Sequence, residues 1–372
     1  MLLTVIIFLA ILGLLVLVHE FGHFIVAKKN GITVEEFGFG FPPRIWGVAW
    51  RGTLYSLNWI PLGGFVRIKG AAGDDEDAQL HTHEKDSFGS KPFWVKSSVL
   101  LAGVGMNILL CVILLSIGFV AGMPSALEEL PGGAKVTDAH VQVAQVLPDS
   151  PAEKAGLLPG DRIMAVNDAA VQKSEEVQAF NQDRAGQTIS LTWKREGETL
   201  TKSLTLMKSE EGYGIIGISL LDVGLVSYDP LRAVVMGVKL TITLIGQIFL
   251  AFGQLIKGLL VERQISADVA GPIGIAVLTG QVAKLGWTYL LQFAALLSVN
   301  LAIFNFIPFP ALDGGRLLFV VMEKVRGKAI SQRVEAIDHG VGYATLLLLM
   351  LLVTVRDIGR FTGGFSWFFD RF

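Results

Sequence analysis

The chain contains 372 residues, of which 52% are hydrophobic and 17% are charged, and its formal net charge at pH 7 is -2. A mean hydropathy of +0.55 is too high for an ordinary soluble domain, and the small negative charge argues against a nucleic-acid partner. The single cysteine, Cys111, excludes an intrachain disulfide and a thiolate metal cluster. The composition therefore predicts a membrane protein that is surrounded by a lipid bilayer.

Four segments are long and apolar enough to cross a bilayer, which requires about 20 such residues in a helix. They cover residues 2–27, 98–123, 285–309 and 336–355. The first has neither a basic start nor a small-residue cleavage site, so we expect it to remain in the protein. The predicted fold class is a mainly α-helical polytopic membrane protein with about four transmembrane helices.

Lysine and arginine residues indicate the orientation of these spans, because they concentrate in cytoplasmic loops. They gather between the first and second spans and again between the third and fourth. We therefore place both loops in the cytoplasm, and the N-terminus and the region between the second and third spans outside it. Basic residues in the C-terminal tail run against this orientation for the fourth span.

The first apolar segment contains an H-E-x-x-H motif formed by His19, Glu20 and His23. Residues four apart share one face of a helix, so the two imidazoles can bind one ion while the glutamate acts on a bound water. Zinc hydrolases have this arrangement, with three protein ligands and a fourth position left to water. The alternative is a polar cluster at a helix end that reaches the interface or pairs with another helix.

Residues 37–70 are rich in glycine, aromatic and β-branched residues, and Arg-Gly-Thr at 51–53 suits a turn between two extended runs. The segment is too apolar for a solvated loop and too broken by proline for a spanning helix. It therefore predicts a β-hairpin that re-enters the membrane. A free strand edge could bind an extended peptide, and the alternative is a hairpin that only plugs the fold. The residues assigned to substrate binding are Leu54, Tyr55, Ser56, Leu57 and Asn58.

Hydrophobicity falls from about Asp138 to Met207, where strand-like alternation and turn signals predict a soluble domain. A helix is expected after Ser174, with this serine as its cap. The stretch SPAEKAGLLPGDRIMAVND resembles a PDZ domain. That resemblance implies an α/β module that binds extended peptides or peptide ends at a sheet edge. A domain that only blocks access sterically is the alternative.

Residues 229–262 are long and apolar but interrupted by Lys239, Gln247, Gln254 and Lys257. Either a fifth span or helices lying on the bilayer surface fits this pattern. A fifth span would reverse the orientation of everything that follows it, including the second basic loop. We therefore favour the surface helices.

The third span ends in NFIPFPALDGGR, residues 305–316, where two prolines interrupt the helix before Asp313. The carboxylate of Asp313 can complete a site that has two imidazole ligands. Taken alone, Asp313 could instead cap the following helix. The H-E-x-x-H motif in another span favours the ligand over the cap.

Several stretches together resemble the site-2 protease family of intramembrane metalloproteases, in particular its bacterial regulator of sigma-E protease type. They are HEFGH, GFGFPPRIW, PLGGFVRI, GVGMN, AGPIGI and NFIPFPALDGG. The resemblance implies that His19, His23 and Asp313 bind one catalytic Zn²⁺ and that Glu20 is the catalytic base. It also implies that the Asn305 amide holds or polarises the scissile carbonyl.

The resemblance further implies an intramembrane endopeptidase of the bacterial cytoplasmic membrane, with its active site toward the cytoplasmic side. Its expected substrates are single-span membrane proteins, such as anti-sigma factors and remnants of signal peptides. Many relatives carry two PDZ domains, whereas this chain has room for one. Gly103 and Asn107, in the second span, are assigned to close helix packing and not to catalysis.

The predicted organisation has four parts: an N-terminal membrane part (1–123), an extracytoplasmic PDZ domain with its flanks (124–228), membrane-associated linker helices (229–284) and a C-terminal membrane part (285–372). Two other functions are considered. An inactive PDZ scaffold with a structural zinc would have no need of Glu20. A membrane transporter would be expected to show repeated span architecture, and the sequence contains no internal repeat.

Overall fold

The computed structural model describes residues 2–71, 84–128, 130–195, 197–209, 212–258, 261, 270–328, 330 and 332–362. The chain divides into two compact units. The helical unit comprises Met1–Leu115, Gly237–Ala283 and Leu290–Phe372, and the sheet unit comprises Ser116–Met236 and Lys284–Tyr289.

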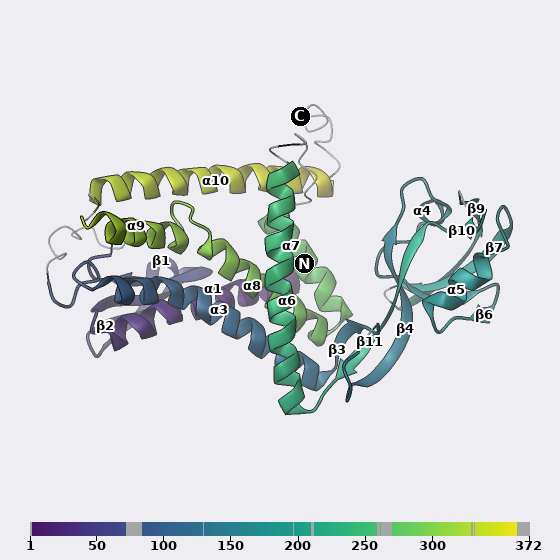
Figure 1. Cartoon of the computed structure of the whole chain (residues 1–372), viewed down its shortest axis with the longest axis horizontal. Coiled ribbons are helices and arrows are strands. Elements are labelled where there is room, and N and C mark those ends of the chain that lie inside the picture. The colour runs from purple at the N-terminus through teal and green to yellow at the C-terminus, as the bar shows by residue number, and fades with distance from the viewer. Residues whose placement is uncertain are drawn as a thin grey trace. The chain divides into compact units, whose positions relative to one another are not determined.

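Helices build most of the helical unit, and long apolar runs form most of them (Figure 1). They are α1 (Leu2–Lys29), α3 (Phe93–Ala121), α6 (Pro230–Lys257), α7 (Pro272–Leu285), α8 (Trp287–Phe306), α9 (Asp313–Arg326) and α10 (Gln332–Thr362). Five of the described helices are long and apolar enough to cross a membrane, namely α1, α3, α6, α8 and the Ile337–Gly359 part of α10. Four of these five coincide with the predicted spans.

Helix α6 is the fifth candidate, where the sequence predicts surface helices over residues 229–262. It is one continuous helix of 28 residues, about 42 Å long at 1.5 Å per residue, which is enough to cross a bilayer. Length and composition thus admit α6 as a span, and its surface placement stays a prediction.

The predicted hairpin forms from β1 (Val34–Trp50) and β2 (Thr53–Ile68), joined at Arg51 and Gly52, whose φ angles are 47° and 74°. The turn at 51–53 is confirmed, and positive φ at both central residues is typical of tight hairpin turns. Each long strand, however, pairs twice. Gly38 lies opposite both Ser56 and Phe65, and Ser56 also lies opposite Gly47.

The double pairing makes a sheet of four segments in the order 44–50, 53–60, 34–41 and 63–68. Segment 53–60 is therefore interior, with partners on both sides. The outer segments are 44–50 and 63–68, and no described strand pairs with the far edge of either. Leu54–Asn58 thus lack the free backbone edge on which their predicted contact with substrate depended.

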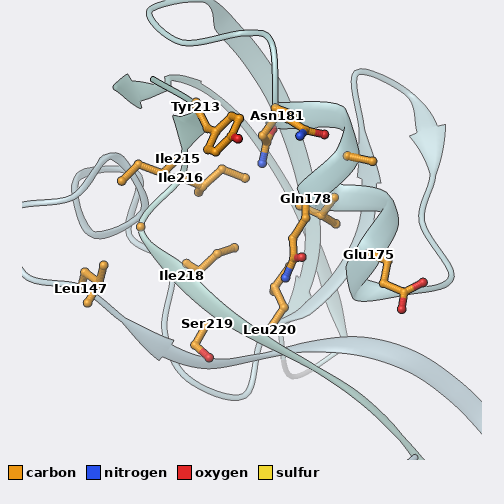
Figure 2. A pocket seen from close by; sticks show the side chains of 15 residues that line it. Leu147, Glu175, Gln178, Asn181, Tyr213, Ile215, Ile216, Ile218, Ser219 and Leu220 are labelled. Atoms are coloured by element: carbon orange, nitrogen blue, oxygen red, sulfur yellow. The ribbon is translucent and has the colours of Figure 1, made fainter. Parts of the chain in front are cut away.

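The sheet unit contains the strands β3 (Met123–Ala126), β4 (Lys135–Val146), β5 (Arg162–Val166), β6 (Ala169–Ala170), β7 (Thr188–Arg195), β8 (Glu198–Thr205), β9 (Met207–Lys208), β10 (Gly214–Ile215) and β11 (Ile218–Ser227), with the helices α4 (Pro151–Ala155) and α5 (Ser174–Asn181). Its main sheet has the order β3-β11-β4-β5-β7-β8, with β6 paired to β5. Strand β11 pairs with β4 along its length but with β3 only at Val223–Val226. The start of β11 lies beside α5, where a groove opens (Figure 2).

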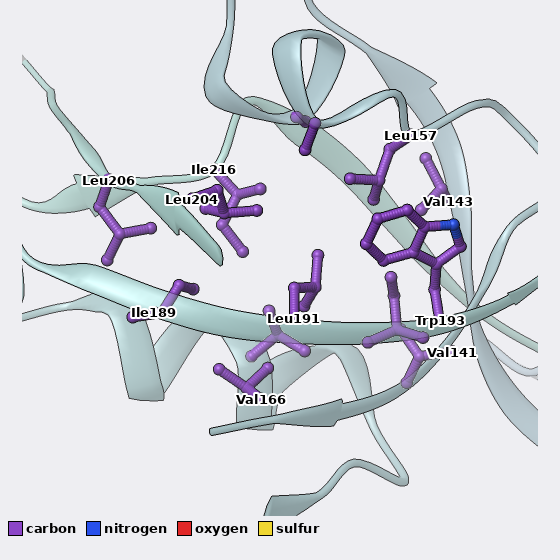
Figure 3. Close-up of a cluster of buried hydrophobic side chains, with 14 residues drawn as sticks. Val141, Val143, Leu157, Val166, Ile189, Leu191, Trp193, Leu204, Leu206 and Ile216 are labelled. Atoms are coloured by element: carbon purple, nitrogen blue, oxygen red, sulfur yellow. The ribbon is translucent and has the colours of Figure 1, made fainter. Parts of the chain in front are cut away.

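Alternating apolar residues of β4, β5 and β7 form the core of the sheet unit (Figure 3). On β7, Ile189, Leu191 and Trp193 are buried, as expected for a strand with one face on the core. The short helix α4 begins at Pro151, and Ser150 caps it by accepting from the backbone N–H of Glu153. Ser174 is the first residue of α5 and does not cap it; its backbone N–H donates to Asp222 Oδ1 at 2.7 Å.

Candidate metal centre

The three residues predicted as metal ligands meet inside the helical unit. Nε2 of His19 lies 3.1 Å from Nε2 of His23, and Oδ2 of Asp313 lies 3.0 Å and 3.2 Å from these two nitrogens. Tetrahedral zinc with bonds of 2.0–2.1 Å to nitrogen holds its ligands about 3.3 Å apart. The nearly equilateral triangle of two nitrogens and one oxygen therefore fits a zinc ion.

Helix α1 and the start of α9 bring these atoms together. His19 and His23 are one turn apart on α1, so both imidazoles project from the same face. Asp313 is the first residue of α9, and the cap position belongs to Leu312, which makes no side-chain cap bond. The carboxylate of Asp313 is thus directed to the imidazoles, and the alternative role as a helix cap is not observed.

Helix α10 contacts the loop that precedes Asp313. Ala311 adopts a φ of 73°, and its backbone N–H donates to Nδ1 of His339 at 3.0 Å. A side chain at Gly342, also on α10, would collide with Pro310. This helix therefore packs directly against the loop that carries Asp313, the candidate third ligand.

Space for an ion depends on Gly103 of α3. A Cβ atom at Gly103 would collide with Nε2 of His23 and would lie 2.8 Å from Nε2 of His19. The missing side chain therefore leaves open the region between the two donor nitrogens. The sequence interpretation assigned Gly103 only to helix packing, and the structure adds that it clears room at the ligand atoms.

The second ring nitrogen of His23 is also engaged. Nδ1 of His23 donates to the carbonyl oxygen of Val99 at 2.8 Å. This bond keeps the proton on Nδ1 and leaves the lone pair of Nε2 available to a metal, as is usual for histidine ligands. The sequence did not single out Val99, because a backbone acceptor carries no sequence signal.

Glu20 lines a cavity of about 250 Å³ together with His19, His23 and Asp313. The glutamate lies outside the ligand triangle but opens to the same space, as a base acting on a metal-bound water must. Asn305 also lines this cavity, and its amide donates to the carbonyl oxygen of Leu301 at 3.0 Å.

The hairpin contributes to the cavity through a segment that was not assigned a role. Phe65 and Val66, in outer segment 63–68, line the cavity, whereas none of Leu54–Asn58 does. Asn58 is instead buried in the sheet, where its amide donates to the carbonyl oxygen of Gly40 at 3.1 Å. The sequence signal for segment 63–68 was the stretch PLGGFVRI.

Comparisons with known proteins identify the family of the chain. The model of peptidase family M50 matches residues 7–349. A protein of Clostridium perfringens is 35% identical over 346 residues, which cover 92% of this chain and 95% of its own length. Zinc metalloprotease RasP of Oceanobacillus iheyensis is 31% identical over 439 aligned residues, which cover 96% of this chain and 99% of its own.

Solved structures similar to this chain include a PDZ domain. The PDZ domain of the SdrC-like protein from Listeria monocytogenes is 28% identical, with a TM-score of 0.22, and covers 23% of this chain and 92% of that domain. The family match, in contrast, extends over nearly the whole sequence. The chain therefore belongs to peptidase family M50, the site-2 protease family, and is a multi-pass membrane zinc metalloprotease.

Proposed function

We propose that this metalloprotease is an endopeptidase that hydrolyses a peptide bond within or beside the transmembrane segment of single-span membrane proteins. Anti-sigma factors and signal-peptide remnants are the proposed classes of substrate. One observation carries the proposal: the ligand triangle of His19, His23 and Asp313 shares a cavity with Glu20 among apolar helices. A scaffold with a structural zinc would have no use for a glutamate in that cavity.

The residues divide the chemistry between them. His19, His23 and Asp313 hold one zinc ion, which when bound lowers the pKa of a water and polarises a carbonyl. Glu20 accepts the proton of the attacking water and returns it to the leaving amine. Asn305 lies at the same cavity, where its amide can exchange its bond to Leu301 for one to the scissile carbonyl.

A transmembrane helix must unwind before a protease can cleave it, because its backbone groups are paired within the helix. We propose that the unwound stretch adds as a strand to outer segment 63–68. Two observations support this: the far edge of the segment has no described partner strand, and Phe65 and Val66 line the cavity. Strand addition supplies backbone hydrogen bonds without demanding a particular sequence.

We also propose that the four-segment sheet enters the membrane, as the sequence predicted for the hairpin. Trp46, Trp50 and Trp59 support this placement, because they are 62%, 58% and 68% exposed in the helical unit. Large exposed aromatic side chains suit a lipid interface. The basic loops support a metal centre on the cytoplasmic side and an N-terminus on the outside.

The central test compares wild-type protein with Glu20→Gln on a single-span substrate in liposomes. Glutamine keeps the size of the side chain but removes the base, so we expect cleavage to fall by about 100-fold or more while bound zinc stays constant. Cleavage that persists in Glu20→Gln, or that survives removal of zinc by a chelator, would sink the mechanism.

Proline replacements test the substrate strand. Neighbouring residues of a strand point their N–H groups to opposite edges. Of Phe65→Pro and Val66→Pro, one variant therefore removes a donor from the free edge of segment 63–68, and the other removes a donor from the edge that is paired. We expect the variant that loses the free-edge donor to cleave substrate at least 10-fold more slowly while keeping its zinc. Val48→Pro and Ala49→Pro, in the other outer segment, are the controls. Equal effects at the two edges would reject segment 63–68 as the substrate strand.

For the sheet unit we propose an extracytoplasmic peptide-binding role, in line with the PDZ resemblance of its sequence. The groove in Figure 2 has a volume of about 730 Å³ and lies between α5 and the start of β11. Val177 and Gln178 line it from the helix, and Ile216 and Ile218 line it from the strand side. A strand edge facing a helix suits an extended peptide or its end.

Filling the groove tests this role. Gln178→Trp places a large side chain in the groove and should weaken binding of peptides at least 10-fold. Asp183→Trp, at an exposed position that does not line the groove, should leave binding unchanged. Unchanged peptide binding in Gln178→Trp would favour a domain that acts only as a steric block.

A further inference from the structure

Asn107 of α3 is a buried amide in the middle of an apolar helix. Its side chain has no exposed surface, and its Oδ1 has no hydrogen-bond partner among the described residues. Its Nδ2 lies 3.4 Å from Nδ1 of His19. A buried polar atom without a partner is costly, particularly in a membrane-spanning helix, so this arrangement calls for an explanation.

The protonation of the His19 ring explains why the Asn107 amide is buried beside it. Nε2 of His19 points at Asp313 and His23, so a bound metal occupies the lone pair of Nε2 and the proton resides on Nδ1. A proton on Nδ1 needs an acceptor, and an amide NH2 group cannot accept. The oxygen of the same amide can, and a half-turn about the terminal side-chain bond exchanges the two atoms.

We infer that, in the zinc-loaded protein, Asn107 accepts a hydrogen bond from Nδ1 of His19 through Oδ1 and holds this ligand in its metal-binding orientation. Asn107 is thus a positioning residue. It does for His19 what the carbonyl oxygen of Val99 does for His23. Such outer partners fix the ring and the tautomer of histidine ligands.

The position of Asn107 is itself fixed. Ser298 of α8 donates to the backbone carbonyl oxygen of Asn107 at 2.8 Å. Gly103 lies one turn earlier on α3 and faces the tips of the imidazoles. The spacing of Gly103 and Asn107 therefore puts both on one face of α3, where one leaves room for the donor atoms and the other contacts the back of His19. Helix packing alone does not require an amide at position 107.

The test measures zinc affinity in the full-length purified protein without substrate, by competition with a chelator. Asn107→Leu keeps a similar volume but removes the acceptor, so zinc should bind about 10- to 100-fold more weakly. Asn107→Asp keeps an acceptor of the same shape and should bind zinc as tightly as wild type or more tightly. The matched control is Asn300→Leu, because the Asn300 amide donates to Leu296 of its own helix α8.

Zinc affinity in Asn107→Leu equal to wild type would overturn the inference. So would a loss of 10-fold or more in Asn107→Asp, which decides the matter even if the leucine variant does not fold. The thermal unfolding temperature of the metal-free proteins separates the two roles. If Asn107 only packs, this temperature should be lower in Asn107→Leu than in wild type. If Asn107 positions His19, Asn107→Leu should lower only the additional stability that zinc gives. The inference rests on the proposed zinc site, and wild-type protein that binds no zinc would instead reject that site.

Discussion

The sheet unit and the helical unit both have apolar cores, but the helical unit also buries a cluster of polar side chains that could hold a metal ion. In the sheet unit the most buried side chains are apolar, and Trp193 and Leu191 are at most 1% exposed. In the helical unit only 17% of the most apolar window of α1 is buried, and His19, His23 and Asn107 are among the residues inside. Lipid can solvate apolar side chains but not polar ones, so polar residues collect inside a membrane bundle only where contacts compensate them.

Substitutions that change side-chain volume by similar amounts should therefore affect different properties in the two units. In the sheet unit such a substitution should alter stability, because the core there is held by packing. In the helical unit a substitution near His19, His23 or Asp313 should alter zinc binding and cleavage, because their ligand atoms all lie within 4.8 Å of one another.

The largest effect is expected from Gly103→Ala. The added methyl group would collide with Nε2 of His23, so zinc affinity should fall by roughly 100-fold or more. Gly105→Ala on the same helix is the matched control, because a Cβ there has no described atom within 4 Å. Chelator competition measures both variants. Tight zinc binding by Gly103→Ala would show that the ligand atoms have more room than the structure gives them.

Trp193→Ala is expected to act on the sheet unit alone. Removing this buried ring should destabilise the unit by about 3–5 kcal/mol, observed as faster hydrogen exchange along β7 and its neighbours. Zinc affinity should be unchanged. Leu158→Ala, at a residue that is 53% exposed, should change stability by less than about 0.5 kcal/mol. A loss of zinc affinity in Trp193→Ala would contradict the prediction that this substitution affects the sheet unit alone.

Gly342→Ala should have an intermediate effect. The new methyl group would press on Pro310 and shift the loop that carries Asp313, so cleavage should fall by about 10-fold. Gly340→Ala lies two residues earlier on α10, where a Cβ has no described atom within 4 Å, and should cleave normally. If both variants behave alike, α10 does not brace the loop.

The smallest effect is expected at the base of the hairpin. Asp86 accepts from the Thr33 hydroxyl at 2.7 Å and from Lys69 at 3.2 Å, and these bonds, the hydroxyl first, hold the pKa of Asp86 below its ordinary value. Their stabilisation is present above the ordinary carboxyl pKa and is lost as pH falls through the lowered one. Because the Asp86 side chain is 44% exposed, water screens its interactions and the change should stay below about 1 kcal/mol. Thr33→Val should flatten the acid side of the thermal-unfolding profile, and an unchanged profile would contradict this.

The parts that sequence anticipated are those set by neighbours along the chain. His19 and His23 share a helix face because they are four residues apart, and the turn at 51–53 follows from its residue types. The interior position of segment 53–60 was missed, because β1 and β2 each pair twice and the second pairing joins residues far apart in sequence. The partner of the Ser174 N–H is likewise remote, in Asp222 of β11.

The sequence by itself predicted the membrane character, and it singled out His19, Glu20, His23 and Asp313 as candidate site residues. Apolar length and helical periodicity are local properties, so they can be read from the chain alone. The tertiary structure decided which strand edge is open and gave Val99, Gly103 and Asn107 their places around the two imidazoles. These roles depend on how closely α1, α3 and the strands pack against one another. The spacing of residues along the chain does not give these distances.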